Sequence, residues 1–161
     1  MKTMIIREFG NYKIEDGYTF DLAEYPVKNC TGCWSCWWRT PGRCMHKDLD
    51  ECYREILKAD KVIIFSKISM GFISGNMKTL LDRLIPLFLP YIKYDTGESM
   101  HLPRYEKYPE VEVYYDGEFI SREEEELYRD YLERTFYQFH MKLRAVESAD
   151  KYSMNRYKEV C

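Results

Sequence analysis

The sequence predicts a single α/β domain in which a mostly parallel β-sheet is covered by helices on both faces. Three observations carry this prediction. Helical and strand patterns alternate from residue 48 onward. The strand patterns are short, unbroken apolar runs, which are typical of strands buried on both faces of a parallel sheet. The length of 161 residues fits one domain with a sizeable core.

The first helix and strand of this alternation lie at residues 49–65. Apolar side chains recur there at helical spacing, and an apolar run at residues 62–65 follows as a buried strand. The helical stripe consists of Leu49, Cys52, Tyr53, Ile56 and Leu57. A loop at residues 66–75 then leads into a second helix at residues 77–84, which Pro86 stops.

The second half of the chain repeats the alternation. Residues 91–109 are expected to form an irregular, tyrosine-rich loop, and long loops in compact domains are often functional. A strand follows at residues 111–115. Ser121 and Glu124 form a capping-box signal for a helix that runs to about residue 140, and a last strand follows at residues 141–146.

The N-terminal region departs from this pattern. Strand patterns at residues 3–7 and 18–22 are separated by only ten residues, with two glycines and no helical stripe. A parallel crossover needs about a dozen residues or more and usually contains a helix. The sequence therefore predicts an antiparallel N-terminal hairpin. The alternative is that residues 3–7 form a loosely attached arm.

Charge and hydropathy exclude several classes of function. The formal net charge is −3 with both signs interspersed, so no basic stripe indicates a nucleic-acid partner. No run of about 18 apolar residues indicates a membrane span, and the N-terminus does not resemble a secretory signal. We therefore expect a cytoplasmic protein. Neither a Ser/His/Asp arrangement nor a pair of carboxylates supports hydrolase chemistry.

Four of the six cysteines follow one compact pattern, C-x2-C-x2-C-x7-C, at Cys30, Cys33, Cys36 and Cys44. Short spacings place successive thiolates on one side of a tight loop, and a turn signal at residues 40–42 returns the fourth cysteine toward the others. Four thiolates suit a 4Fe–4S cluster or zinc. The alternative is a set of packed, reduced thiols at a homo-oligomer interface, because free cysteine is often buried and tryptophans surround this loop. Of the other two cysteines, Cys52 is assigned to the core and Cys161 to the tail.

Four stretches together resemble one known family. They are residues 30–48 (with C-T-G-C-W-S-C-W), 59–66, 74–84 (with L-D-R-L) and 103–109 (P-R-Y-E-K-Y-P). In order and spacing they resemble the flavodoxin-like NAD(P)H-dependent FMN reductases, in particular the iron–sulfur flavoproteins. The Asp82–Arg83 pair within them is interpreted as structural.

The resemblance implies a flavodoxin-like three-layer sandwich that transfers electrons through FMN. It favours a 4Fe–4S cluster on the four cysteines and implies NAD(P)H or a redox protein as electron donor. It also implies that the segment after the strand at residues 62–65 shapes the flavin pocket. The implied pocket residues are Ser66, Lys67, Ile68, Ser69, Met70, Gly71, Phe72, Gly75 and Asn76.

One departure bears directly on the flavin. Members of the family carry a glycine- and serine-rich loop and a long helix after the first strand, and these hold the FMN phosphate. Nothing between Arg7 and Tyr18 matches this pattern, and the side chains of Glu8, Glu15 and Asp16 would repel a phosphate. We therefore expect the domain, residues 1–161, to be truncated in its first β–α unit. Two functions stay open: a flavin-dependent oxidoreductase, or a degenerate flavodoxin-fold protein without FMN that serves as an interaction or oligomerisation module.

Overall fold

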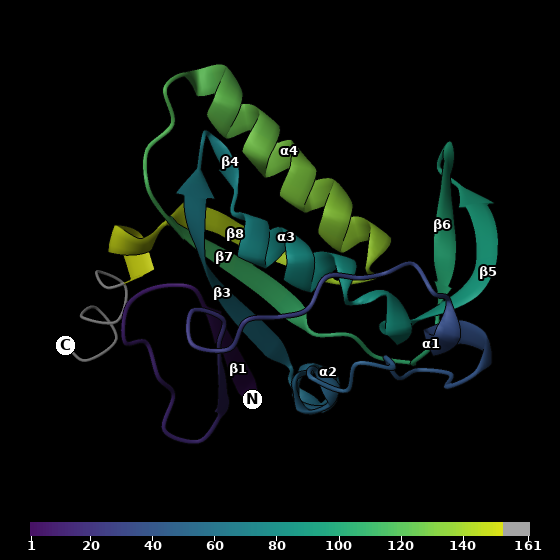
Figure 1. The fold of residues 1–161 in the computed structure, drawn as a ribbon. Helices are drawn as coiled ribbons and strands as arrows, with labels where there is room; N and C mark the ends of the chain where they lie inside the picture. Colours follow the sequence, from purple (N-terminus) through teal and green to yellow (C-terminus); the bar gives the residue numbers. More distant parts are fainter. Residues whose placement is uncertain (153–161) are drawn as a thin grey trace.

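The main β-sheet places five strands in parallel (Figure 1). The computed structural model describes residues 1–152, so the expectation for Cys161 lies outside the described residues. The strands are β1 (Thr3–Arg7), β2 (Tyr18–Asp21), β3 (Lys61–Ser69), β7 (Glu110–Asp116) and β8 (Lys142–Ser148). Their order is β2-β1-β3-β7-β8, and a short strand, β4 (Phe72–Ile73), pairs antiparallel with β3. This is the order of flavodoxin-like doubly wound sheets, so the predicted mostly parallel α/β fold is confirmed.

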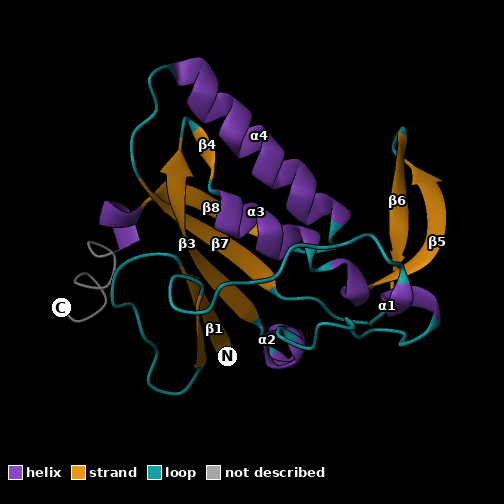
Figure 2. Cartoon of the chain, viewed as in Figure 1, coloured by secondary structure: helices purple, strands orange, loops and turns teal. Residues whose placement is uncertain are grey.

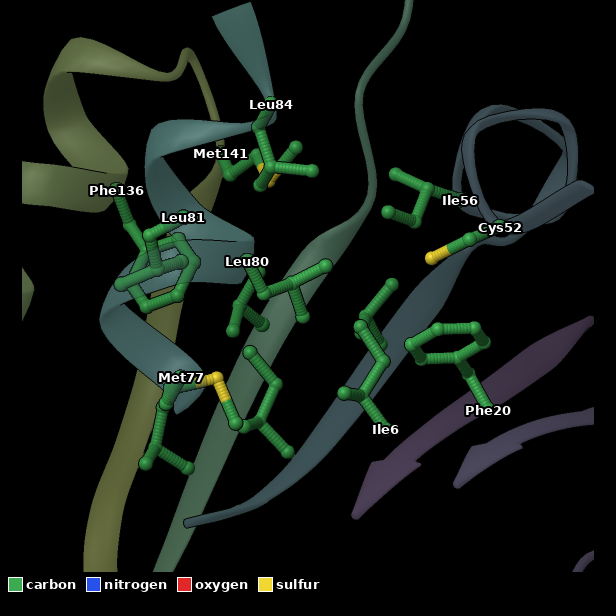
Figure 3. Packing of buried hydrophobic residues seen from close by; sticks show 14 of the residues in the cluster. Ile6, Phe20, Cys52, Ile56, Met77, Leu80, Leu81, Leu84, Phe136 and Met141 are labelled. Carbon is green, nitrogen blue, oxygen red and sulfur yellow. The ribbon is translucent and has the colours of Figure 1, made fainter. Parts of the chain in front are cut away.

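One face of the sheet is covered by helices. These are α2 (Asp50–Lys58), α3 (Gly75–Asp82) and α4 (Arg122–Gln138), which all contribute to the same core cluster. Figure 3 shows Met77, Leu80 and Leu81 of α3 and Phe136 of α4 in this cluster. The side chain of Cys52 points from α2 into it and is 1% exposed, which confirms the assignment of this cysteine to the core.

The helix boundaries follow local signals. The Ser121 side chain accepts a hydrogen bond from the Glu124 N–H at 3.3 Å, so the predicted cap of α4 is confirmed. After α3, the chain forms a 3₁₀ turn, η1 (Ile85–Leu87), that contains Pro86. None of the described helices is long and apolar enough to cross a membrane.

The opposite face of the sheet is covered mainly by a loop, although helices were predicted there too. A second cluster forms around Ile5 and Phe65, and side chains of residues 8–17 pack against it. The rings of Tyr12 and Phe65 stack with centroids 3.7 Å apart and planes 3° apart. Tyr152, in the helical residues 149–152, also contacts the Phe65 ring.

The predicted antiparallel N-terminal hairpin is wrong, because β1 and β2 pair in parallel with Met4 opposite Tyr18. The connecting residues 8–17 form no helix. An extended chain covers roughly 3.3 Å per residue, so ten residues span about twice the length of the five-residue β1. The loop therefore returns to the start of β2 without a helix. Both strands of the first unit are present, and the element that is lacking from it is the crossover helix.

The expected irregular loop at residues 91–109 is also wrong for most of its length. It forms an antiparallel hairpin of β5 (Phe88–Asp95) and β6 (Glu98–Pro103), which stands apart from the main sheet (Figure 2). Thr96 and Gly97 both have positive φ angles, 50° and 83°. These angles indicate the tight turn that favours two-residue hairpin loops. Four of the eight β5 residues are exposed and only Phe88 is buried, so the strand lacks the apolar alternation that would have predicted it.

Candidate functional site

The four predicted cysteine ligands line one cavity of about 300 Å³. Cys30 and Cys33 are exposed, Cys44 is half-buried, and Cys36 is buried on the short helix α1 (Ser35–Trp38). Positive φ angles at Gly32 and Gly42, 63° and 80°, let the loop turn sharply on either side of α1. The four side chains that the spacing predicted to converge thus line the same cavity.

Residues distant in sequence complete the cavity wall. Leu81 and Arg83 contribute from the end of α3, His101 from β6, and Phe139 from the end of α4. The Trp37 indole N–H donates to the Phe88 carbonyl at 3.0 Å, and its ring lies 4.7 Å from that of His101. The cysteine loop is therefore docked on the β5–β6 hairpin. No local sequence signal pointed to these distant residues.

An ion pair closes the cysteine loop at its base. Arg83 is 1% exposed, and its guanidinium donates to both carboxylate oxygens of Asp48 and to the Lys28 carbonyl. The Asp48 carboxylate also accepts the Lys28 N–H at 3.2 Å. Burial acts to raise the pKa of Asp48, but hydrogen bonds from Arg83 and the Lys28 backbone outweigh it and lower this pKa. The interpretation of Arg83 as structural agrees with this geometry.

The thiols in the cavity differ in their surroundings. Hydrogen bonds from Ser35 lower the pKa of the Cys33 thiol, and the Cys33 sulfur lies 3.4 Å from the Met45 sulfur. Burial, and next the proximity of Cys44, raise the pKa of the Cys36 thiol. The pKa values of two of the four thiols are thus shifted in opposite directions, down for Cys33 and up for Cys36.

The four thiols line one cavity but do not form a preformed site for a single metal ion. Within residues 1–152, no three His, Cys, Asp or Glu side chains gather closely enough to hold one metal ion. Zinc would need its four ligands around one centre. A 4Fe–4S cluster distributes four cysteine ligands over separate irons, so four thiols around one apolar cavity fit its chemistry.

The nine predicted flavin-pocket residues do not form a loop. Ser66, Lys67, Ile68 and Ser69 lie in β3, Met70 and Gly71 form the turn to β4, and Phe72 lies in β4. The Phe72 ring packs on Tyr131 of α4 at 4.8 Å, and Met70 is 99% exposed. Gly75 and Asn76 begin α3. The segment is therefore a hairpin that projects past the sheet.

A buried carboxylate lies beside this segment. Glu8 directly follows β1, is 4% exposed, and accepts hydrogen bonds from the Lys67 N–H, the Ser66 hydroxyl and the Ser74 hydroxyl. The sequence indicated that Glu8 would repel a phosphate, but no local pattern indicated its partners. Ser74 caps the start of α3, whereas Arg83 follows its end. The carboxylate and the cysteine cavity thus lie at opposite ends of this helix, about 12 Å long at 1.5 Å per residue.

Fold and site together define a flavodoxin-like α/β protein with a cysteine-lined cavity beside its helical face. No family model matches the chain. An iron–sulfur flavoprotein of Methanocaldococcus jannaschii is 33% identical over 89 residues, which are 53% of this chain and 45% of that protein. An iron–sulfur flavoprotein of Archaeoglobus fulgidus is 34% identical over 81 residues, 49% of this chain and 36% of that protein. The chain spans less than half the length of these relatives, and the predicted resemblance to them is confirmed.

Solved structures agree on the fold. The azoreductase AzrA superposes with a TM-score of 0.59 at 11% identity and covers 98% of this chain and 92% of its own. An FMN-dependent NADH-azoreductase of Bacillus anthracis, solved in complex with FMN, gives a TM-score of 0.56 at 17% identity, covering 99% and 96%. These likenesses confirm the flavodoxin-like fold.

Proposed function

We propose that this protein is a flavin-dependent oxidoreductase of the FMN reductase and iron–sulfur flavoprotein type, with a 4Fe–4S cluster bound by Cys30, Cys33, Cys36 and Cys44. The convergence of these four thiols on one cavity carries the proposal. The iron–sulfur flavoprotein relatives support it, because they share about a third of their aligned residues with this chain.

The chain's own residues would each have a physical task at this centre. The four thiolates would ligate iron, and the Trp37 ring, which lines the cavity, would cover part of the cluster. The Trp37 contact with Phe88 and the Arg83–Asp48 ion pair hold the loop that carries the thiols. A bound flavin would supply two-electron chemistry with NAD(P)H, and a cluster would supply one-electron transfer. The proposal includes NAD(P)H or a redox protein as the electron donor. It also places the protein in the cytoplasm as a homo-oligomer.

The experiment that tests this function is a flavin-reduction assay with protein purified without oxygen. The protein is incubated with FMN or riboflavin, separated from free flavin, and mixed with NADH or NADPH. We expect bound flavin to bleach on reduction and recover with an electron acceptor. Protein that retains no flavin, and gives no NAD(P)H-dependent reduction, would contradict the proposal.

The second candidate function is an interaction module without flavin. Exposed aromatic and aliphatic side chains on the cysteine loop and the β5–β6 hairpin favour it. They are Trp34 (60% exposed), Trp38 (65%), Tyr91 (65%) and Ile92 (63%). Aromatic side chains of this kind are enriched at protein interfaces. In that case, alanine substitutions at these positions would change the oligomeric state of a protein that binds neither flavin nor iron.

A further inference from the structure

The carboxyl ends of β1 and β3 form the topological switch point of the sheet. The chain passes from β1 to β2 on one side, while β3 lies on the other side of β1. In open α/β sheets of this order, ligands bind just outside the strand ends at this point. Glu8 is the first residue after β1, and Ser66 and Lys67 are its neighbours on β3. The position where a ligand's anionic group would be expected is therefore next to a side chain that is itself an anion.

The Glu8 carboxylate uses donors that would otherwise face an anionic ligand. Its Oε2 atom accepts from the Lys67 N–H at 2.8 Å and from the Ser66 hydroxyl at 3.2 Å. Its Oε1 atom accepts from the Ser74 hydroxyl. Backbone N–H groups and hydroxyls beside a helix start are the groups that hold phosphates in proteins. Here the chain supplies both the donors and the anion.

Burial and neighbouring hydrogen bonds hold the Glu8 carboxylate in this position. Glu8 is 4% exposed, and its own N–H donates to the Phe65 carbonyl at 2.9 Å, which fixes the backbone that carries the carboxylate. The Ser74 hydroxyl also accepts the Met77 N–H at 3.0 Å and so completes the cap of α3. A phosphate entering this position would meet a buried negative charge at close range, and like charges repel strongly where water is excluded.

We infer that Glu8 is a specificity-determining residue that fills the phosphate position of the switch point, so that the chain recognises a flavin through its uncharged ring and ribityl parts. This inference rests on the proposed flavin-dependent function. The ligand is then a flavin whose 5′-phosphate contributes nothing to the binding affinity. Riboflavin is then bound at least as tightly as FMN.

The test compares the dissociation constants of riboflavin and FMN for the whole chain, by quenching of flavin fluorescence. We expect the wild-type protein to bind riboflavin at least as tightly as FMN. The substitution Glu8→Gln removes the charge but keeps the shape of the side chain and one of its two acceptor oxygens. This variant should raise the affinity for FMN relative to riboflavin by about tenfold, the factor that a removal of like-charge repulsion of about 1.4 kcal/mol gives.

The matched control is Glu15→Gln, which removes the same charge from an exposed position in the same loop. It should change the ratio of the two dissociation constants by less than about twofold, since exposed charges are screened. Wild-type binding of FMN more than tenfold tighter than riboflavin would overturn the inference about Glu8 and leave the proposed flavin function standing. Binding of neither flavin would overturn both. If Glu8→Gln fails to fold, the wild-type ratio alone decides.

Discussion

The guanidinium of Arg83 and the carboxylate of Asp48 form a two-point ion pair, with Nη2–Oδ1 at 2.5 Å and Nη1–Oδ2 at 3.2 Å. Both residues also bind the backbone of Lys28, through its carbonyl and its N–H. The pair therefore joins the two ends of the segment 28–48, which carries all four candidate ligands. The ion pair thereby fixes the long connection between β2 and α2 as a closed loop over the cavity.

Replacing Arg83 with lysine should weaken the contact between the two ends of this loop. A lysine ammonium cannot make the same forked contact, and each hydrogen bond to a charged group that is lost contributes about 1.5–3 kcal/mol. We expect Arg83→Lys to lower the free energy of unfolding in urea by about 3 kcal/mol. We also expect faster tryptic cleavage at the exposed Arg39, Arg43 and Lys47 in the loop.

The matched control is Lys78→Met, because Lys78 forms an exposed ion pair with Asp82 on α3. Exposed pairs contribute at most about 1 kcal/mol. Arg83→Lys could instead lower the free energy of unfolding no more than this control and leave the rate of tryptic cleavage unchanged. The Arg83–Asp48 ion pair would then not stabilise the loop.

The lowered pKa of Asp48 predicts a stability that depends on pH. Because the pKa of Asp48 is lower in the folded protein than in the unfolded chain, its contribution is complete above the ordinary value of about 3.9. This stabilising contribution is lost as the pH falls below that value and then through the pKa of Asp48 in the folded protein. The difference in unfolding free energy between wild type and Asp48→Asn should therefore be largest near neutral pH and shrink in acid below about pH 4.

Urea titrations at several pH values measure this difference, with Asp82→Asn as the control for an exposed carboxylate. A gap between wild type and Asp48→Asn that stayed constant down to the acid limit would show that the charge of Asp48 does not contribute to folding.

The loop at residues 8–17 should depend on the stacking of Tyr12 against Phe65. Tyr12→Ala removes the ring that covers this face of the sheet, and we expect it to destabilise the fold by about 2–3 kcal/mol. Tyr12→Phe keeps the ring and should cost much less. Tyr25→Ala, at a position 62% exposed, is the matched control. Thermal unfolding measures all three, and equal losses for Tyr12→Ala and Tyr25→Ala would contradict the packing role.

The turn between β3 and β4 offers a stabilising substitution. Met70 and Gly71 both have positive φ angles, 52° and 72°, and the Met70 side chain is 99% exposed. Asparagine followed by glycine is preferred in such turns. Met70→Asn should therefore raise the melting temperature slightly, by the equivalent of about 0.5 kcal/mol, whereas Gly71→Ala should lower it by about 1 kcal/mol or more. The reverse order of these two effects would exclude this turn geometry.

The elements that the sequence predicted correctly have strong local signals. The apolar stripe of α2, the cap of α4 at Ser121 and the apolar run of β3 each appear within a few neighbouring residues. The parallel pairing of β1 with β2 occurs together with a long-range contact, the stacking of Tyr12 in their connection on Phe65 of β3. No local pattern contains that contact. The β5–β6 hairpin escaped prediction because only Phe88 of β5 is buried, so the strand shows no apolar alternation.

The candidate site divides in the same way. Close spacing predicted that Cys30, Cys33, Cys36 and Cys44 would converge. The wall that they share with His101 and Phe139 depends on the docking of a hairpin and a helix from far along the chain. Likewise, the charge of Glu8 was visible in the sequence, but its hydrogen bonds to residues 66, 67 and 74 come only with the completed sheet.

The most direct test of the central claim is an assay of iron and acid-labile sulfide on protein purified without oxygen and reconstituted with both. We expect about four irons and four sulfides per chain in the wild type. Cys36→Ser should lose both, while Cys52→Ser, whose sulfur lies in the core beneath α2, should retain them. A wild-type protein that holds no iron or sulfide after reconstitution, or that holds them equally well in Cys36→Ser, would contradict the assignment of the cysteine cavity as a cluster site.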